Sequence, residues 1–404
     1  MQTVSLRDLR HDPLRTLFYL HIQPPAFDFI RAGLAQFWPT LSDQAALRQV
    51  DRSLYILGAI LLGLLVSVAF RWLAAQCGIP VAVAGSFLLM LHPAAIFFAS
   101  YLDSTMLSAF LILCAFHLLW RLKNGGHVSM WLFGAVTLAL FFTRSIFQWP
   151  FMLLFAVCLM LFGVPRSRWI IFLVLTTLIS GLYLAKQYRL FAILSTSSFT
   201  GVNLANSIGA GIGSAKYAAY LNETGHLTRA TAAMPSVLTS KTKLADQPNF
   251  NHIDYLYLNQ TLLNRYAKQL LGSSVEELAD NYLENAAIYF RPSSTYSSHH
   301  VIVDRLPWRM AYDAIFSAPA LPVLLLLAFT VWCARVFRAQ SFTRGLGLLL
   351  PGLLVFMLSI VSDKGENMRF KFFLEPVMLI FLVGQFHACA RLGLSRLAEA
   401  QRAA

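Results

Sequence analysis

Long apolar segments constrain this chain more than any other feature of its sequence. Charged residues make up only 13% of its 404 residues, about half their usual share in a soluble domain. A helix needs about 20 apolar residues to cross a bilayer. Nine segments reach or approach that length: 52–72, 79–99, 104–121, 129–145, 149–163, 168–186, 314–334, 345–361 and 371–390. We therefore expect an all-α membrane protein, a multi-pass bundle of about nine transmembrane helices, and not a soluble globular fold.

Every second connection between the predicted helices is rich in basic residues. Five connections are rich in them: those with Arg71, with Arg121 and Lys123, with Arg166 and Arg168, with Arg335, Arg338 and Arg344, and with Arg391 and Arg396. Because cytoplasmic loops collect lysine and arginine, we expect these five on the cytoplasmic side and the intervening connections outside. The same rule explains the net charge of +13, and no aromatic-laced basic surface segment points to a nucleic-acid partner.

The predicted topology divides the chain into five parts. They are an extracytoplasmic loop with an interfacial helix (1–51), a six-helix transmembrane bundle (52–186), a large extracytoplasmic domain of mixed helix and loop (187–313), three more transmembrane helices (314–391) and a cytoplasmic tail (392–404). Within the third part, 273–290 has apolar residues at helical spacing and begins with serine caps. No helix precedes 1–51 to carry it across the membrane. Either this short N-terminal segment is translocated by itself, or the true start lies upstream and one helix is missing, which is the alternative that we favour.

Three features at predicted outer helix ends could carry chemistry. Pro24 and Pro25, after His21, end an extended segment and start a helix, since proline is tolerated in a first turn; a purely structural elbow is the alternative. Asp103 stands where an outer loop enters a helix, as a cap or as a functional carboxylate. Arg144 ends a helix on the side where positive charge is not expected. It either snorkels to the surface or binds an anion.

A dense cluster of charges lies just before and within the last apolar segment. Its members are Lys364, Glu366, Arg369, Lys371 and Glu375. A solvated loop would also be rich in charge. Glu375, however, lies next to Pro376 in an apolar segment, at a depth where charge is costly and usually functional. We therefore expect a functional cluster here.

These motifs together resemble the GT-C superfamily of glycosyltransferases that use polyprenyl-phosphate sugars, and within it the protein mannosyltransferase and aminoarabinose transferase-like branch. The resemblance rests on His21-Ile-Gln-Pro24-Pro25, on Asp103 and on Glu366-Asn367-Met368-Arg369-Phe370. In that family an acidic residue early in the first outer loop is the catalytic base. The candidates for that role in this sequence are Asp8 and Asp12.

The resemblance implies a membrane glycosyltransferase, a hexosyl- or pentosyltransferase, at a bacterial cytoplasmic (inner) membrane with its site on the outer side. The expected catalytic residues are Asp103, Asp12 and Asp8; the expected substrate-binding residues are His21, Pro24, Pro25, Arg144, Lys364, Glu366 and Arg369. Arginine or lysine would stabilise the leaving phosphate, and a carboxylate would deprotonate the acceptor. The implied partners are a polyprenyl-phosphate-linked sugar, a glycan, lipid or protein acceptor, and membrane lipid. No cofactor or metal ligand set is predicted, and dependence on a divalent metal stays open.

Two other classes of function stay open. One is an O-antigen ligase or polymerase-like transferase, which also combines many helices with one large outer loop and arginines. The other is a lipid-linked sugar transporter or flippase. Carriers place charged residues near mid-membrane, whereas the charges of this sequence gather at predicted outer helix ends. A transferase consumes its lipid-linked sugar, and a flippase only relocates it.

Overall fold

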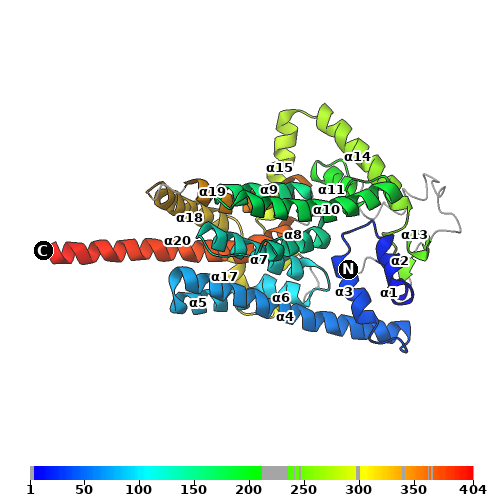
Figure 1. The fold of residues 1–404 in the computed structure, drawn as a ribbon, viewed down its shortest axis with the longest axis horizontal. Coiled ribbons are helices and arrows are strands. Elements are labelled where there is room, and N and C mark those ends of the chain that lie inside the picture. The colour runs from blue at the N-terminus through cyan, green and yellow to red at the C-terminus, as the bar shows by residue number, and fades with distance from the viewer. Residues whose placement is uncertain are drawn as a thin grey trace.

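We analysed a computed structural model of the chain. It describes residues 4–211, 235–240, 242–244, 247–296, 301–338, 342–362, 364 and 367–403. Ten helices form an apolar bundle: α4 (Asp43–Cys77), α5 (Ile79–Met90), α6 (Pro93–Ser100), α7 (Thr105–Lys123), α8 (Met130–Thr143), α9 (Trp149–Leu161), α10 (Arg166–Phe191), α18 (Ala320–Arg338), α19 (Phe342–Ser362) and α20 (Asn367–Ala403). Each of the nine predicted apolar segments lies on one or two of them, so the expected helical bundle is confirmed (Figure 1).

The lengths of these helices set how many can cross a membrane. Five of the described helices are long and apolar enough, namely α4, α7, α10, α19 and α20. Two bent pairs raise the number to seven if each is one span: α5 with α6, at 54°, and α17 (Arg309–Ile315) with α18, at 51°. α8 and α9 have only 14 and 13 residues, short of the about 20 that a span needs. The chain is a multi-pass integral membrane protein, and a total of nine spans stays a prediction.

Two of the long helices present apolar faces to their surroundings. In an apolar stretch of 18 residues in each helix, only 22% of the residues of α4 and 17% of those of α10 are buried inside the protein. Exposed side chains four residues apart form a stripe on each helix: Ile56, Ile60 and Leu64 on α4, and Val174, Leu178 and Leu182 on α10. Water disfavours such stripes and lipid does not. These two faces therefore suit contact with the hydrocarbon of a bilayer.

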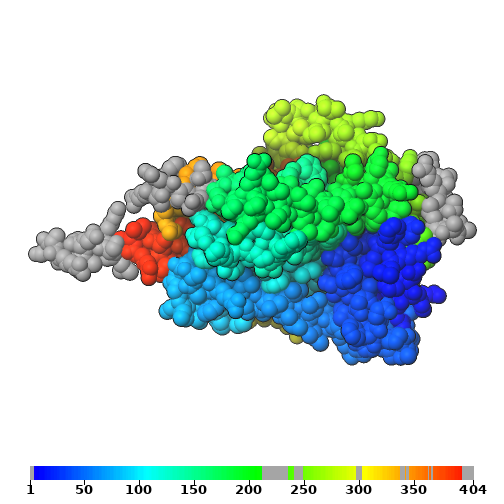
Figure 2. Space-filling view, in the orientation of Figure 1, coloured from blue at the N-terminus to red at the C-terminus, as the bar shows by residue number. Residues whose placement is uncertain are grey.

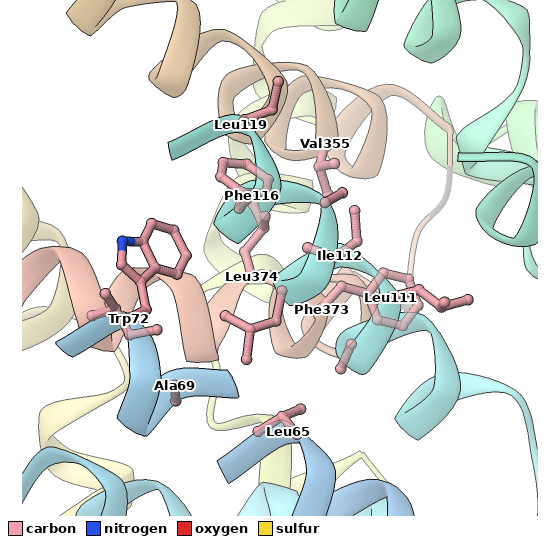
Figure 3. Close-up of a cluster of buried hydrophobic side chains, with 14 of the residues drawn as sticks. Leu65, Ala69, Trp72, Leu111, Ile112, Phe116, Leu119, Val355, Phe373 and Leu374 are labelled. Atoms are coloured by element: carbon pink, nitrogen blue, oxygen red, sulfur yellow. The ribbon is translucent and has the colours of Figure 1, made fainter. Parts of the chain in front are cut away.

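The core of the bundle lies between α4, α7, α19 and α20. α7 is the central helix of this core, and 67% of its apolar 18-residue stretch is buried. Figure 3 shows the packing of side chains from the four helices: Leu65, Ala69 and Trp72 on α4, Leu111, Ile112, Phe116 and Leu119 on α7, Val355 on α19, and Phe373 and Leu374 on α20. This packing fixes the ends of α7 and α20 beside each other, and the candidate site lies at one of those ends.

Three short helices precede the bundle: α1 (Leu6–His11), α2 (Pro13–Phe18) and α3 (Ala26–Ala35). Asp12 caps α2 by accepting a hydrogen bond from the backbone N–H of Arg15, and Pro13 takes the first helical position. Pro25 is the N-cap of α3. The predicted helix start after the proline pair is therefore confirmed, while its location at a membrane surface stays a prediction.

The polar region between α10 and α18 is built of short elements. In chain order after α10 they are α11 (Thr200–Ser207), α13 (Ser236–Thr239), β1 (Thr242–Leu244), β2 (Gln247–Pro248), α14 (Asp254–Gly272), α15 (Val275–Tyr289), η3 (Ser293–Thr295), α16 (Val301–Asp304) and α17. β1 and β2 form an antiparallel hairpin. Ser274 caps α15 by accepting from the backbone N–H of Glu277, which confirms the helix predicted over 273–290. Figure 2 shows α14 and α15 projecting from the flank of the bundle.

The two ends of the bundle differ in their charged residues. α20 extends beyond one end, and α1 to α3 cover the other (Figure 1). The first end, here called the basic end, holds Arg71, Arg121, Lys123, Arg335 and Arg391. The charges of these side chains are close enough to act on one another or on Cys77 and His117. The opposite end, here called the site end, holds Asp103, Arg144 and Arg369. These eight side chains therefore lie at opposite ends of the bundle, while the full topology and the end that faces the cytoplasm stay predictions.

Candidate functional site

Asp103 lies at the site end, in the turn between α6 and α7. Its carboxylate binds Thr105 twice: Oδ1 accepts from the backbone N–H at 2.7 Å and Oδ2 from the hydroxyl at 2.8 Å. A carboxylate beside the first N–H groups of a helix is favoured by the helix dipole. Asp103 therefore does cap the start of α7, although Ser104 holds the formal N-cap position.

Arg144 reaches the same carboxylate from the end of α8. Its Nη2 donates to Asp103 Oδ2 at 2.7 Å and to Thr105 Oγ1 at 3.1 Å. The side chain is 15% exposed, and its buried Nε makes no hydrogen bond with any described residue. Arg144 therefore does not snorkel toward the surface. Its guanidinium pairs with the Asp103 carboxylate inside the protein, and whether it also binds a ligand anion stays a prediction.

Arg369, in the first turn of α20, completes the group. Its Nη1 lies 3.3 Å from Asp103 Oδ2, and its side chain is 9% exposed. The guanidinium carbon lies 5.1 Å from the ring centre of Tyr296, a cation–π arrangement. Tyr296 packs edge-on against Tyr101, with ring centres 5.9 Å apart. Neither tyrosine could be selected from the sequence, because the ring contacts that bring each to Arg369 come from distant parts of the chain.

The electrostatics of the group favour the ionised form of Asp103. Burial raises the pKa of the Asp103 carboxyl, but Arg144, Arg369 and the hydrogen bonds from Thr105 outweigh it, so that pKa lies below its usual range. Burial and the nearby Arg369 lower the pKa of Arg144 to about 10, against the opposing effect of Asp103. At neutral pH, two guanidinium forks thus converge on one carboxylate. Such forks match phosphate as well as carboxylate oxygens.

A small cavity of about 20 Å³ joins Asp103 to the N-terminal helices. Phe27 and Ile30 of α3 line it together with Tyr101 and Asp103. Its volume admits about one water molecule, so a substrate group would reach Asp103 only if neighbouring side chains moved. α3, whose N-cap is Pro25, therefore lies against the turn of Asp103.

His21 lies in a separate network. It is fully buried, with Nε2 2.9 Å from the carbonyl oxygen of Asn251 and Nδ1 2.8 Å from Ser198 Oγ. Because a carbonyl only accepts, Nε2 carries the proton and the hydroxyl donates to Nδ1. The backbone N–H of His21 also donates to the Asn251 side chain, at 2.8 Å. This geometry favours a structural role, joining the N-terminal segment to the polar region.

Asp8, Asp12 and Lys364 make their described contacts with residues outside the three-residue group. Asp8 accepts a hydrogen bond from Ser236 at 2.7 Å, and Asp12 caps α2; no hydrogen bond or ion pair described for these residues joins either of them to Asp103. Lys364 forms an ion pair of 2.6 Å with Glu284 on the flank. Glu366 lies outside the described residues.

A second buried cluster follows Arg369 on α20. Lys371 Nζ lies 3.2 Å from Glu375 and donates to the carbonyl oxygens of Arg291 and Phe316, each at 2.6 Å. Ser293 donates to Glu375 at 2.7 Å. Lys371 and Glu375 are 0% and 1% exposed. These two buried charges, which the sequence analysis assigned to a functional cluster, pair with each other and bind residues of the polar region. They hold α20 in place behind Arg369.

The described residues contain no group of three or more His, Cys, Asp or Glu side chains that could hold a metal ion. Neither a protein-family profile nor a curated protein sequence matches the chain. Among solved structures, the crystal structure of ArnT from Cupriavidus metallidurans in the apo state aligns with 95% of this chain and 71% of its own, at 13% identity and a TM-score of 0.32. A likeness this weak carries no conclusion about the fold or the activity of this chain.

Proposed function

We propose that this protein is a membrane glycosyltransferase that moves a sugar from a polyprenyl-phosphate donor to an acceptor hydroxyl at the site end. The observation that carries the proposal is the convergence of Arg144 and Arg369 on Asp103. Two nearly buried guanidinium groups at the end of an apolar bundle suit a ligand with an anionic head and a long apolar tail. A lipid-linked sugar phosphate is such a ligand.

In the proposed reaction, the two arginines bind the phosphate of the donor. The bond between the sugar carbon and the phosphate oxygen breaks, the polyprenyl phosphate leaves with the electron pair, and the acceptor oxygen bonds to the sugar with inversion. Arg144 and Arg369 stabilise the charge that grows on the leaving phosphate. The spare Nε donor of Arg144 adds a further hydrogen bond to that oxyanion.

Asp103 has two proposed roles that occur in sequence. Before the donor binds, it positions both guanidinium groups, and its low pKa makes it a weak base. When the phosphate takes over the arginines, the carboxylate loses the charges that hold its pKa down, and it becomes better able to accept the proton of the acceptor hydroxyl. Asp8 and Asp12 remain the alternative bases, and each would first have to leave its present hydrogen bond.

The proposed setting is the outer face of a bacterial cytoplasmic membrane, with a glycan, lipid or protein as acceptor. The charge distribution supports this orientation, because the basic end would then face the cytoplasm. An O-antigen ligase or polymerase-like transferase, which also combines many helices with one large outer loop and arginines, is the alternative transferase. A transporter would need no breaking of the sugar–phosphate bond.

The test is turnover in proteoliposomes supplied with a panel of labelled polyprenyl-phosphate sugars and a bacterial envelope extract as acceptor. We expect release of polyprenyl phosphate from at least one donor, and loss of that release by on the order of 10²-fold in Arg144→Ala. A donor that only changes leaflet identifies a flippase and overturns the proposal.

A further inference from the structure

A large cavity lies in the bundle, away from Asp103. Its volume is about 1460 Å³, and residues of α4, α7, α15, α18, α19 and α20 line it. Along α20 it extends from Leu374 to Leu392, and at 1.5 Å per residue these 18 steps span about 27 Å. Trp72, Phe116 and Leu374, seen in Figure 3, contribute apolar walls. The cavity, here called the basic-end groove, is therefore nearly as long as the hydrocarbon layer of a bilayer is thick.

One end of the groove is positively charged. Lys123, Arg335 and Arg391 line it at the basic end of the bundle, and its described lining includes no Asp or Glu. His387 also lines the groove, and its buried Nε2 has no hydrogen-bond partner among the described residues. Three cations and an unused ring nitrogen thus gather at the mouth of an otherwise apolar cavity.

Aromatic side chains mark the same level of the groove. The indole rings of Trp72 and Trp120 lie 6.0 Å apart, and both N–H groups point to the side-chain oxygen of Gln76 when that amide is oriented to accept them. Indole rings prefer the boundary between hydrocarbon and head groups. The mouth therefore lies where a lipid head group would be, with apolar walls extending from it toward the site end.

We propose that the basic-end groove binds an anionic phospholipid, with its phosphate at Lys123, Arg335 and Arg391 and its acyl chains along α20. Basic residues at cytoplasmic helix ends are common and by themselves indicate no site. Arg166 and Arg168 show the difference, because they lie at the start of α10 and do not line the groove. Charge at the mouth and apolar length behind it together match an amphipathic anion. This inference does not rest on the proposed transferase activity.

The test compares lipid retention by native mass spectrometry, using the full chain purified in a neutral detergent. The probes are phosphatidylglycerol and phosphatidylcholine with the same acyl chains. The test variant is Lys123→Ala/Arg391→Ala, since no described hydrogen bond or ion pair depends on these two side chains. The matched control, Arg166→Ala/Arg168→Ala, removes the same charge from the same end but outside the groove.

We expect the wild-type chain and the control to prefer phosphatidylglycerol by about 25-fold or more. The test variant should lose about 25-fold of that affinity, since each of its two removed basic groups is worth about fivefold near a lipid surface. Gly352→Leu adds bulk to the apolar wall, where the nearest atom to a new Cβ is Phe116 Cζ at 3.7 Å; we expect it to weaken both lipids. Equal retention of the two lipids by the wild type, or equal loss in test and control, would overturn the proposal. So would full displacement of phosphatidylglycerol by inorganic phosphate alone or by a polyprenyl phosphate.

Discussion

The guanidinium of Arg369 lies 3.3 Å from the carboxylate of Asp103, although 266 residues separate the two in the chain. Arg144 reaches the same oxygen from a third helix. The starts of α7 and α20 and the end of α8 are therefore held together by one carboxylate. Without the Asp103 carboxylate, two buried guanidinium groups would face each other with no opposite charge between them. The free-energy cost of these unpaired charges exceeds that of the lost hydrogen bonds alone.

Asp103→Asn separates the charge of this residue from its capping role. Asparagine caps a helix about as well as aspartate, so the start of α7 should persist. We expect the loss of charge to lower stability by about 3 kcal/mol. Adding Arg144→Gln should restore part of it, with a coupling of about 1–3 kcal/mol between the two sites. Thermal denaturation of the four proteins of the cycle in detergent measures the coupling, and simple additivity would argue against a shared ion pair.

Acid should loosen the N-terminal helices through His21. Burial lowers the pKa of His21 to about 3, although its hydrogen bond to Asn251 opposes the shift. The unfolded value is about 6.5, so protonation favours the unfolded form: the stabilisation is complete above about pH 6.5 and falls by about 1.4 kcal/mol per unit below it. At pH 5, this region should have lost about 2 kcal/mol.

Hydrogen exchange of residues 4–42 at pH 7 and pH 5, corrected for intrinsic rates, measures this loss. His21→Asn should remove the pH dependence. His11 is exposed at the end of α1, so His11→Asn is the matched control and should keep it. An unchanged pH dependence in His21→Asn would show that another group titrates.

The positions of the helices could be predicted from the sequence, because apolar length, proline and serine are local signals. The break between α5 and α6 was missed: apolar residues continue through it, and only His92, which accepts from the N–H of Ala94, and Pro93 mark it. Asp103, Arg144 and Arg369 could each be selected from charge at a helix end. Their pairing could not, since it depends on how distant helices pack.

For His21, the local sequence motif and the contacts in the structure point to different roles. Its neighbouring prolines suggested a substrate-binding motif. Both ring nitrogens, however, are hydrogen-bonded to Ser198 and Asn251, which lie 177 and 230 residues away in the chain. No local pattern marks a buried histidine whose hydrogen bonds are satisfied by a remote loop. A single sequence therefore distinguishes poorly between a structural and a functional polar residue.

The buried pair of Lys371 and Glu375 should contribute to stability as a unit. Removing one partner leaves the other charged and buried, so we expect Lys371→Met and Glu375→Met each to cost about 3–5 kcal/mol. The double variant should cost clearly less than the sum. Lys364→Met, which breaks the more exposed pair with Glu284, serves as the control at about 1 kcal/mol or less. A double variant as costly as the two singles together would refute the coupling.

The orientation of the chain can be tested by cysteine labelling of intact cells. We expect Ser240→Cys, in the polar region, to react with an impermeant maleimide from outside. Asn124→Cys, exposed at the basic end, should react only after permeabilisation. The parent chain sets the background from its own cysteines. The opposite labelling pattern would reverse the topology and place the site end in the cytoplasm.

Retention of a polyprenyl phosphate by the purified protein tests the proposed phosphate role of Arg369 most directly, because every such donor leaves this product whatever its sugar. We expect the wild type to retain the phosphate in preference to the free polyprenol. Arg369→Ala should lose on the order of tenfold or more in affinity, and Arg369→Lys less, because lysine keeps the charge but not the fork. Lys268→Ala, on the exposed face of α14, is the matched control. Equal retention of the phosphate by the wild type and Arg369→Ala, with both proteins folded, would contradict a phosphate site at Asp103, Arg144 and Arg369.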